Sequence, residues 1–163
     1  MKTSLKQMLY IAVTAALVAV ATLFLHIPIP MQAGFCNLGD GVILGAGALI
    51  GPYAALAGAV GSALSDLILG YGLYAPATAV IKGLIGAISG ILCAQAVKPA
   101  RRALYMVAAE CWMVAGYFLF ETLLYGASVA VTSLPGNGFQ AAASVVVGML
   151  LWPLLNRVKK IIA

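Results

Sequence analysis

The sequence predicts an all-α integral membrane protein, a compact bundle of six transmembrane helices with both termini on the cytoplasmic side. The prediction rests on composition, on the lengths of the apolar runs and on where the basic residues fall. Of 163 residues, 64% are hydrophobic and 8% are charged, and the mean hydropathy is +1.09. Soluble domains average roughly 45–50% apolar and about 25% charged residues, and could not bury this much apolar surface. This excludes a soluble enzyme, a nucleic-acid-binding domain and a disordered chain.

The first apolar run extends from Met8 to Ile27. About 20 residues of helix cross a hydrocarbon core about 30 Å thick. The run is longer than the roughly 7–15 apolar residues of a signal peptide, and no Ala-x-Ala cleavage site follows it. Pro28 and Pro30 end it, because proline lacks a backbone donor and disfavours helix before it. We predict a spanning helix over residues 8–27.

The next apolar run, Leu38 to Leu69, is too long for one span and is interrupted by Gly51-Pro52. We predict two helices, over 38–51 and 53–69, joined by a tight turn in which proline opens the second helix. At about 1.5 Å per residue, each is marginal for the bilayer and should pack inside the bundle. Small residues recur there every four positions, which allows close helix packing: Gly41/Gly45, Gly47/Gly51, Ala54/Gly58, Ala59/Ala63 and Gly86/Gly90.

Three further helices complete the predicted bundle. The fourth covers 76–97 and the fifth covers 103–126. A polar loop over 128–138, rich in proline and glycine, is expected to separate the fifth helix from the sixth, over 139–156. The chain is predicted to form one membrane domain, 1–163.

The nine basic residues give the orientation of the bundle. Only Lys82 lies inside an apolar run, and the others lie at the two ends or in one short loop: Lys2, Lys6, Lys98, Arg101, Arg102, Arg157, Lys159 and Lys160. With six spans, the two ends and this loop fall on one side, and the three opposite loops contain no lysine or arginine. By the positive-inside rule both termini are cytoplasmic, so the net charge of +5 reports topology rather than a polyanionic partner.

Neither a metal site nor a catalytic set is predicted. Cys36, Cys93 and Cys111 are odd in number and widely spaced, so we interpret them as free apolar residues without a disulfide or zinc site. The chain has one histidine and contains no HExxH, GxSxG or Walker sequence. No cofactor is expected. An active transporter built on this chain would take its energy from ATP hydrolysis in another subunit.

Polar residues at membrane depth are the candidate functional residues, because each costs several kcal/mol unless it is paired or hydrated. In the predicted topology four charged residues fall in the outer half: Asp40, Asp66, Lys82 and Glu121. His26, Asn37, Tyr74, Asn137 and Gln140 fall at the same level.

Helical spacing aligns several of these side chains. Tyr74, Thr78 and Lys82 repeat every four residues, as do Tyr117, Glu121 and Tyr125, and Asn137, Gln140 and Ser144 follow a three-four rhythm. We therefore expect an outward-facing cavity suited to a small polar heteroaromatic molecule, whose ring stacks on tyrosine while amides and carboxylates bind its polar atoms.

Several of these residues could have a structural role instead of binding a substrate. Asp40 is either a helix cap or a ligand contact, and His26 is either an interface residue or a ligand contact. Asp66 and Lys82 could neutralise each other across adjacent helices. Glu110, nearer the inner side, could pair with Arg101, Arg102 or the C-terminal basic cluster. Glu121 is the strongest functional candidate, because no second basic residue is available in the outer half.

The central block resembles the substrate-binding S components of energy-coupling factor (ECF) transporters, in the branch that groups riboflavin, hydroxymethylpyrimidine and vitamin B6 uptake proteins. The resemblance covers nearly the whole chain. The residues that carry it are Asn37-Leu38-Gly39-Asp40, Gly51-Pro52, Gly61-Ser62-Ala63-Leu64-Ser65-Asp66, Gly70-Tyr71, Tyr74-Ala75-Pro76-Ala77-Thr78, Ile81-Lys82-Gly83, Gly116-Tyr117-Phe118, Glu121, Asn137 and Gln140.

The resemblance implies a six-helix subunit in the plasma membrane of a prokaryote that captures a vitamin from outside. Such a subunit docks on a T component and two cytoplasmic ATPases, and topples in the membrane to release its cargo inward. The family's alanine motif, which packs on the T component, aligns with Ala12/Ala16 or with Ala15/Ala19. These four alanines share one small-residue helix face, and packing within the bundle is the alternative role.

The substrate does not follow from the resemblance, because binding residues vary between branches. We favour a small pyridine or pyrimidine, of the vitamin B6 or hydroxymethylpyrimidine type, because Trp112 and Trp152 are not placed near the outer cavity. The alternatives are a riboflavin-specific S component and a small channel-like or structural membrane protein. The predicted substrate-binding residues are His26, Asn37, Asp40, Tyr74, Thr78, Lys82, Tyr117, Glu121, Tyr125, Asn137 and Gln140.

Overall fold

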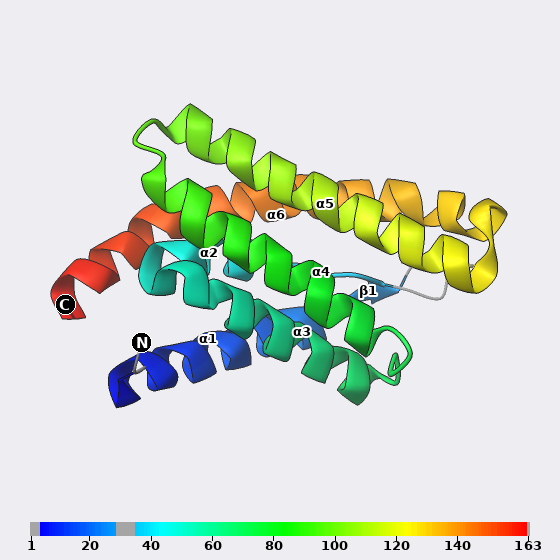
Figure 1. The fold of residues 1–163 in the computed structure, drawn as a ribbon, viewed down its shortest axis with the longest axis horizontal. Helices are drawn as coiled ribbons and strands as arrows, with labels where there is room; N and C mark the ends of the chain where they lie inside the picture. The colour runs from blue at the N-terminus through cyan, green and yellow to red at the C-terminus, as the bar shows by residue number, and fades with distance from the viewer. Residues whose placement is uncertain (1–3, 29–34, 163) are drawn as a thin grey trace.

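A computed structural model describes residues 4–28 and 35–162 as an all-helical bundle (Figure 1). Its elements are α1 (Leu5–Phe24), β1 (Ile27–Pro28), β2 (Phe35–Cys36), α2 (Gly39–Ile50), the 3₁₀ turn η1 (Gly51–Tyr53), α3 (Ala54–Leu69), α4 (Ala75–Ile88), the π-helical turn η2 (Ser89–Cys93), α5 (Pro99–Tyr125) and α6 (Ala127–Ile162). The predicted all-α class is thus confirmed, with a two-residue strand pair after α1.

Five helical stretches within the described residues are long and apolar enough to cross a membrane. They are Leu5–Phe24, Gly39–Leu69, Ala75–Cys93, Pro99–Tyr125 and Ala127–Ile161. The second stretch holds both α2 and α3, which η1 joins. The 12 residues of α2 extend only about 18 Å and are too short to span the bilayer alone. Many large apolar side chains lie exposed on the outside of the bundle, as a lipid environment requires.

Helix α1 lies three residues earlier at both ends than the predicted span, 8–27. Ser4 caps its N-terminus in a capping box with Gln7, whose side-chain oxygen accepts from the Ser4 backbone N–H at 3.0 Å. After the helix ends at Phe24, β1 pairs with β2 in antiparallel register. Pro30, predicted to help end the helix, lies outside the described residues.

The predicted break between the second and third helices is confirmed. Gly51 adopts a positive φ of 56°, which favours glycine, and Pro52 follows it within η1. The turn is covered by η2, where a Cβ on Gly90 would lie 2.6 Å from the nitrogen of Pro52. A Cβ on Gly58 of α3 would lie 2.8 Å from the carbonyl oxygen of Lys82 on α4. Small residues thus let these helix backbones approach closely.

The predicted polar loop over 128–138 is wrong, because α6 begins at Ala127 and runs through this segment. Gly126, with a φ of 87°, connects α5 to α6 as a single residue. Pro135 lies inside α6, where it removes one backbone donor. Helix α6 packs along α2 and α5, and such packing lets a membrane helix tolerate proline.

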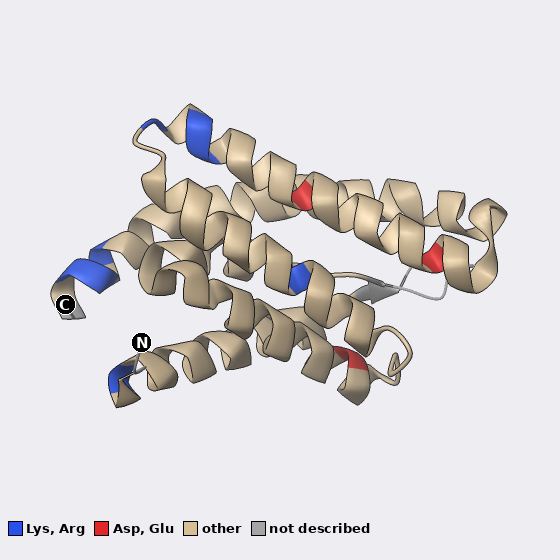
Figure 2. Ribbon diagram, in the orientation of Figure 1, with Lys and Arg blue, Asp and Glu red and all other residues tan. Residues whose placement is uncertain are grey.

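The two chain ends and the connection between α4 and α5 lie at the same end of the bundle (Figure 1). Apart from Lys82 in the middle of α4, the described lysine and arginine residues gather there, whereas the acidic residues lie in the middle and toward the opposite end (Figure 2). Helix α5 starts at this basic end with Pro99 in its first turn, four residues before the predicted start. The fold thus separates a basic end from a polar interior.

The four alanines predicted as one docking face of α1 divide between the inside and the outside of the bundle. Ala15 is buried and Ala19 is half-buried, whereas Ala12 and Ala16 are exposed. Helix α1 packs along α3, and Ser65 Oγ on α3 donates to the Ala19 carbonyl oxygen at 3.4 Å. Ala15 and Ala19 thus contact the bundle interior, and Ala12 and Ala16 are the exposed pair. Docking of this helix on a T component stays a prediction.

Candidate functional site

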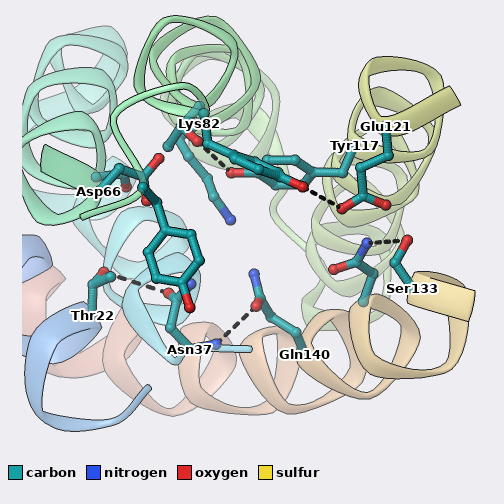
Figure 3. Close-up of a pocket in the computed structure, with 13 residues that line it drawn as sticks. Thr22, Asn37, Asp66, Lys82, Tyr117, Glu121, Ser133 and Gln140 are labelled. Atoms are coloured by element: carbon teal, nitrogen blue, oxygen red, sulfur yellow. Dashed lines mark hydrogen bonds between the residues drawn. The ribbon is translucent and has the colours of Figure 1, made fainter. Parts of the chain in front are cut away.

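A polar cavity lies among the helices in the half of the bundle away from the basic end. It measures about 30 Å³, and about 500 Å³ of empty space is present when its open mouth is included. Its lining residues come from α1, α3, α4, α5, α6 and the segments between them (Figure 3): Thr22, Asn37, Ser62, Asp66, Tyr71, Tyr74, Thr78, Lys82, Tyr117, Glu121, Ser133, Asn137 and Gln140.

The floor of the cavity is a buried charge network that joins three helices. Lys82 Nζ on α4 lies 2.6 Å from Asp40 Oδ2 on α2, and the two side chains are 2% and 0% exposed. Gln140 Nε2 on α6 donates to the same carboxylate oxygen at 2.6 Å. Asp40 therefore satisfies a buried ammonium group and a buried amide, which is how a membrane interior accommodates a charged pair.

Asn37 and Gln140 fix the segment between β2 and α2 to α6. The Asn37 backbone N–H donates to Gln140 Oε1 at 2.8 Å, and Asn37 Oδ1 accepts from the Gly39 backbone N–H at 2.9 Å. Thr22 Oγ1 lies 3.4 Å from the same Asn37 oxygen. Asn37, which precedes the N-cap residue Leu38, thus accepts from the first backbone N–H of α2. Asp40, considered as a cap or a ligand contact, is the partner of Lys82.

Aromatic side chains form one wall. The Tyr74 ring lies edge-on to Phe120, with centroids 5.2 Å apart, and 6.5 Å from the ring of Tyr117. The ammonium group of Lys82 lies 5.2 Å from the Tyr117 ring centroid, within cation–π range. The Tyr117 hydroxyl pairs with Thr78 Oγ1 at 2.9 Å. These contacts orient ring faces and hydroxyl groups around the cavity.

Tyr74 also contacts the carboxylate of Glu121. Its hydroxyl donates to Glu121 Oε1 over 3.4 Å. Burial, followed by the charge of Glu121, raises the pKa of Tyr74 above its ordinary value, so the phenol stays protonated as a donor. Within the described residues, the second oxygen of Glu121 and one oxygen of Asp66 are buried without a hydrogen-bond partner.

The structure brings together most of the predicted site residues. Those that line the cavity are Asn37, Tyr74, Thr78, Lys82, Tyr117, Glu121, Asn137 and Gln140. Asp40 lies behind Lys82 and holds it. His26 and Tyr125 are not among the lining residues: His26 Nδ1 lies 2.7 Å from the Leu23 carbonyl oxygen, and Tyr125 is 39% exposed.

Five lining residues were not predicted as binding residues: Thr22, Ser62, Asp66, Tyr71 and Ser133. Asp66 had been considered as the partner of Lys82, but that lysine pairs with Asp40. Ser133 lies one helical turn before Asn137 and was missed because its segment was interpreted as a loop. Its Oγ lies 3.5 Å from Asn137 Nδ2.

Glu110 does not form the predicted pair with the basic residues of the inner end. It is 1% exposed, and neither carboxylate oxygen has a hydrogen-bond partner among the described residues. Arg101 donates to the Tyr105 hydroxyl at 2.8 Å, and Arg102 donates to the Ala96 carbonyl oxygen at 2.7 Å. Both arginines are thus occupied at the α4–α5 connection.

Fold and site together define a class, namely a multi-pass membrane protein with a polar cavity between its helices. The chain belongs to the ECF-type riboflavin transporter S component family, whose profile matches residues 2–157. The expected resemblance is thereby confirmed. S components are the substrate-binding subunits of membrane transporters rather than enzymes. Membership of this family implies, in general, a vitamin as substrate and an ECF module as partner.

A relative from Pyrococcus woesei is similar over most of its length. It is described as an uncharacterized protein in a gap 3' region, and it is 38% identical over 141 residues. The match covers 86% of this chain and 95% of the relative.

Proposed function

We propose that this chain is the high-affinity substrate-binding subunit of an ECF-type uptake transporter for a small water-soluble vitamin or precursor, of the vitamin B6 or hydroxymethylpyrimidine type. It captures the substrate from outside, and an ATP-driven module of a T component and two ATPases delivers it inward. The chain forms one membrane domain, 1–163, in the plasma membrane of a prokaryote. In this proposal its six helices traverse the bundle, with the short α2 packed inside it, and the basic end is cytoplasmic.

The observation that carries the proposal is the cavity that gathers tyrosine rings, amides and carboxylates from separate helices at the end opposite the basic residues. Such a lining suits a small heteroaromatic ring with polar substituents. About 500 Å³ of empty space is present when the open mouth is included, and Tyr71 and Tyr74, in the connection between α3 and α4, border it.

A riboflavin-specific S component is the second candidate, and the description of the matching family favours it. Against it, neither tryptophan lines the cavity: Trp112 is 39% exposed, and Trp152 lies 4.7 Å from the guanidinium carbon of Arg102. A channel-like protein is the third candidate. The Lys82–Asp40 pair closes the floor of the cavity and argues against an open pore.

Binding to the purified protein tests the proposal. We expect native mass spectrometry to reveal a copurified small molecule, and Glu121→Gln to weaken its binding about 10- to 100-fold, because a charge-assisted hydrogen bond is lost. Glu110→Gln is the matched control, since it makes the same change on the same helix at a buried acid that does not line the cavity. Ion conductance without saturable binding would instead support a channel.

A further inference from the structure

Two acidic side chains of the cavity have hydrogen-bonding capacity that the protein does not use. Asp66 on α3 is 4% exposed and Glu121 on α5 is 6% exposed. Asp66 Oδ2 and Glu121 Oε2 are buried and have no hydrogen-bond partner among the described residues. Figure 3 shows the two carboxylates on opposite sides of the cavity, with Lys82 and Tyr117 between them.

Two hydroxyl groups lie beside these carboxylates and also have other partners. Ser133, next to Glu121 in Figure 3, donates to the Ala130 carbonyl oxygen at 2.8 Å. Thr78, which lies near Asp66, is hydrogen-bonded to the Tyr117 hydroxyl at 2.9 Å. Even with these hydroxyls nearby, one oxygen of each acid has no hydrogen-bond partner among the described residues, whereas buried polar groups are normally satisfied.

The residues that line the cavity also carry more acidic than cationic groups. Lys82 is the one cationic side chain among the described residues that line the cavity, and Asp40 already pairs with it at 2.6 Å. Asp66 and Glu121 add two acidic groups without adding a cation. Burying an uncompensated carboxylate is costly, so a ligand that supplies positive charge and N–H donors removes a cost that the empty site carries.

The aromatic wall favours the same kind of ligand. The rings of Tyr71, Tyr74 and Tyr117 all border the cavity, and the ring of Tyr117 already attracts the Lys82 ammonium group. Tyrosine faces stabilise cations and stack on flat heteroaromatic rings.

We propose that the substrate is an amine-bearing heteroaromatic, a pyridine or pyrimidine ring that carries a protonated or exocyclic amine, with donors directed to Asp66 and Glu121. This rests on the proposed function, since it specifies the ligand of the same cavity. The inference distinguishes between vitamins that the proposed function treats alike. Their rings are similar, but their substituents differ in charge.

Matched ligand pairs test the proposal on the full-length purified protein. Pyridoxamine and pyridoxine differ in one substituent, an aminomethyl in place of a hydroxymethyl group. 4-Amino-5-hydroxymethyl-2-methylpyrimidine and its 4-hydroxy analogue form the second pair, and riboflavin is included. We expect the amine-bearing member of at least one pair to bind at least about 10-fold more tightly than its partner, from one added charge-assisted hydrogen bond.

Two variants test whether Asp66 and Glu121 cause the preference for the amine. Glu121→Gln and Asp66→Asn keep the side-chain shape but remove the charge, and each should reduce the preference for the amine at least about threefold. Glu110→Gln, outside the cavity, should leave the preference unchanged. If one acid variant does not fold, the other variant and the wild-type ligand pairs still decide the question.

The outcomes separate this inference from the proposed function. A hydroxyl-bearing member or riboflavin that binds as tightly as the amines, or more tightly, overturns the inference and leaves a vitamin-binding subunit in place. A preference for amines that survives in both acid variants also overturns it, because the acids would not be its cause. Failure of every compound to bind, with no copurified molecule, rejects the proposed function and the inference together.

Discussion

Lys82 has a defined electrostatic partner although it lies within an apolar helix. Its ammonium group is 2.6 Å from Asp40 Oδ2, and Gln140 donates to the same oxygen at the same distance. A buried pair of this kind costs more to break than it contributes when formed, because removal of one partner leaves an isolated buried charge.

Removal of the lysine charge should therefore destabilise the fold. We expect Lys82→Met to lower the free energy of unfolding by about 3–5 kcal/mol, seen as a lower melting temperature in detergent. The double variant Lys82→Met with Asp40→Asn should be less destabilised than the sum of the two single variants, because it leaves no unpaired charge. Additive losses would show that the two side chains do not interact.

At the scale of elements, the site depends on close packing of short helices around small residues. Glycines on α2, α3, α4 and η2 bring backbones together where a side chain would collide. The α2–α3 turn, with Gly51 and Pro52, lies directly against η2. This contact fixes α4, and therefore Thr78 and Lys82, relative to α2 and Asp40.

Substitution at that contact should disturb the bundle. A Cβ on Gly90 would lie 2.6 Å from Pro52 N, and this neighbour is backbone that cannot rotate away. We expect Gly90→Val to destabilise the protein by about 1–3 kcal/mol, measured by thermal unfolding.

Gly138→Ala is the matched control for this prediction. Gly138 lies inside α6, and a Cβ there would meet no atom within 4 Å. Because glycine is about 1 kcal/mol less favourable than alanine within a helix, the control should leave stability unchanged or raise it. A destabilised Gly138→Ala protein together with a stable Gly90→Val protein would contradict this packing.

The whole molecule has two chemically different ends. Apart from Lys82, the described basic residues gather at the end that holds both termini (Figure 2). The cavity lies in the other half. In the proposed function, the cavity half faces the substrate outside and the basic end faces the cytoplasm.

The outer surface of α1 is the candidate for docking. Ala15 lies against α3, where a Cβ on Gly61 would lie 2.5 Å from the Ala15 carbonyl oxygen, and Ala19 also packs on α3 through its carbonyl oxygen. Both are therefore covered within the bundle, which leaves Ala12 and Ala16 exposed for a partner.

The exposed pair is the better test of docking on a T component. We expect Ala12→Leu and Ala16→Leu to leave vitamin binding within about twofold of wild type but to reduce uptake into cells about 10-fold or more, because bulk on this face prevents close helix packing. Ala142→Leu is the control, since Ala142 is an exposed alanine on α6. Normal uptake by both α1 variants would place the docking face elsewhere.

Glycine and proline residues predicted a helix boundary correctly where tertiary packing also breaks the helix. They predicted it wrongly where packing keeps the helix continuous. Gly51 and Pro52 gave the α2–α3 turn correctly. Pro135 and its neighbours indicated a loop by the same rules, yet the segment is helical. Contacts of α6 with α2 and α5 compensate for the donor that proline lacks, and those contacts join residues far apart in the sequence. The interpretation of this segment as a loop also hid Ser133 from the predicted site.

The sequence by itself determined that this is a helical membrane protein with a basic end, because composition and the lengths of hydrophobic runs do not depend on how the helices pack. It also determined most of the cavity lining, because helical periodicity places residues four apart on one face. Only the tertiary structure decided which buried charges pair. Asp40, rather than the sequentially nearer Asp66, meets Lys82, since pairing depends on how α2, α4 and α6 pack in three dimensions. That choice leaves Asp66 without the lysine as a partner, and within the described residues one oxygen each of Asp66 and Glu121 accepts no hydrogen bond.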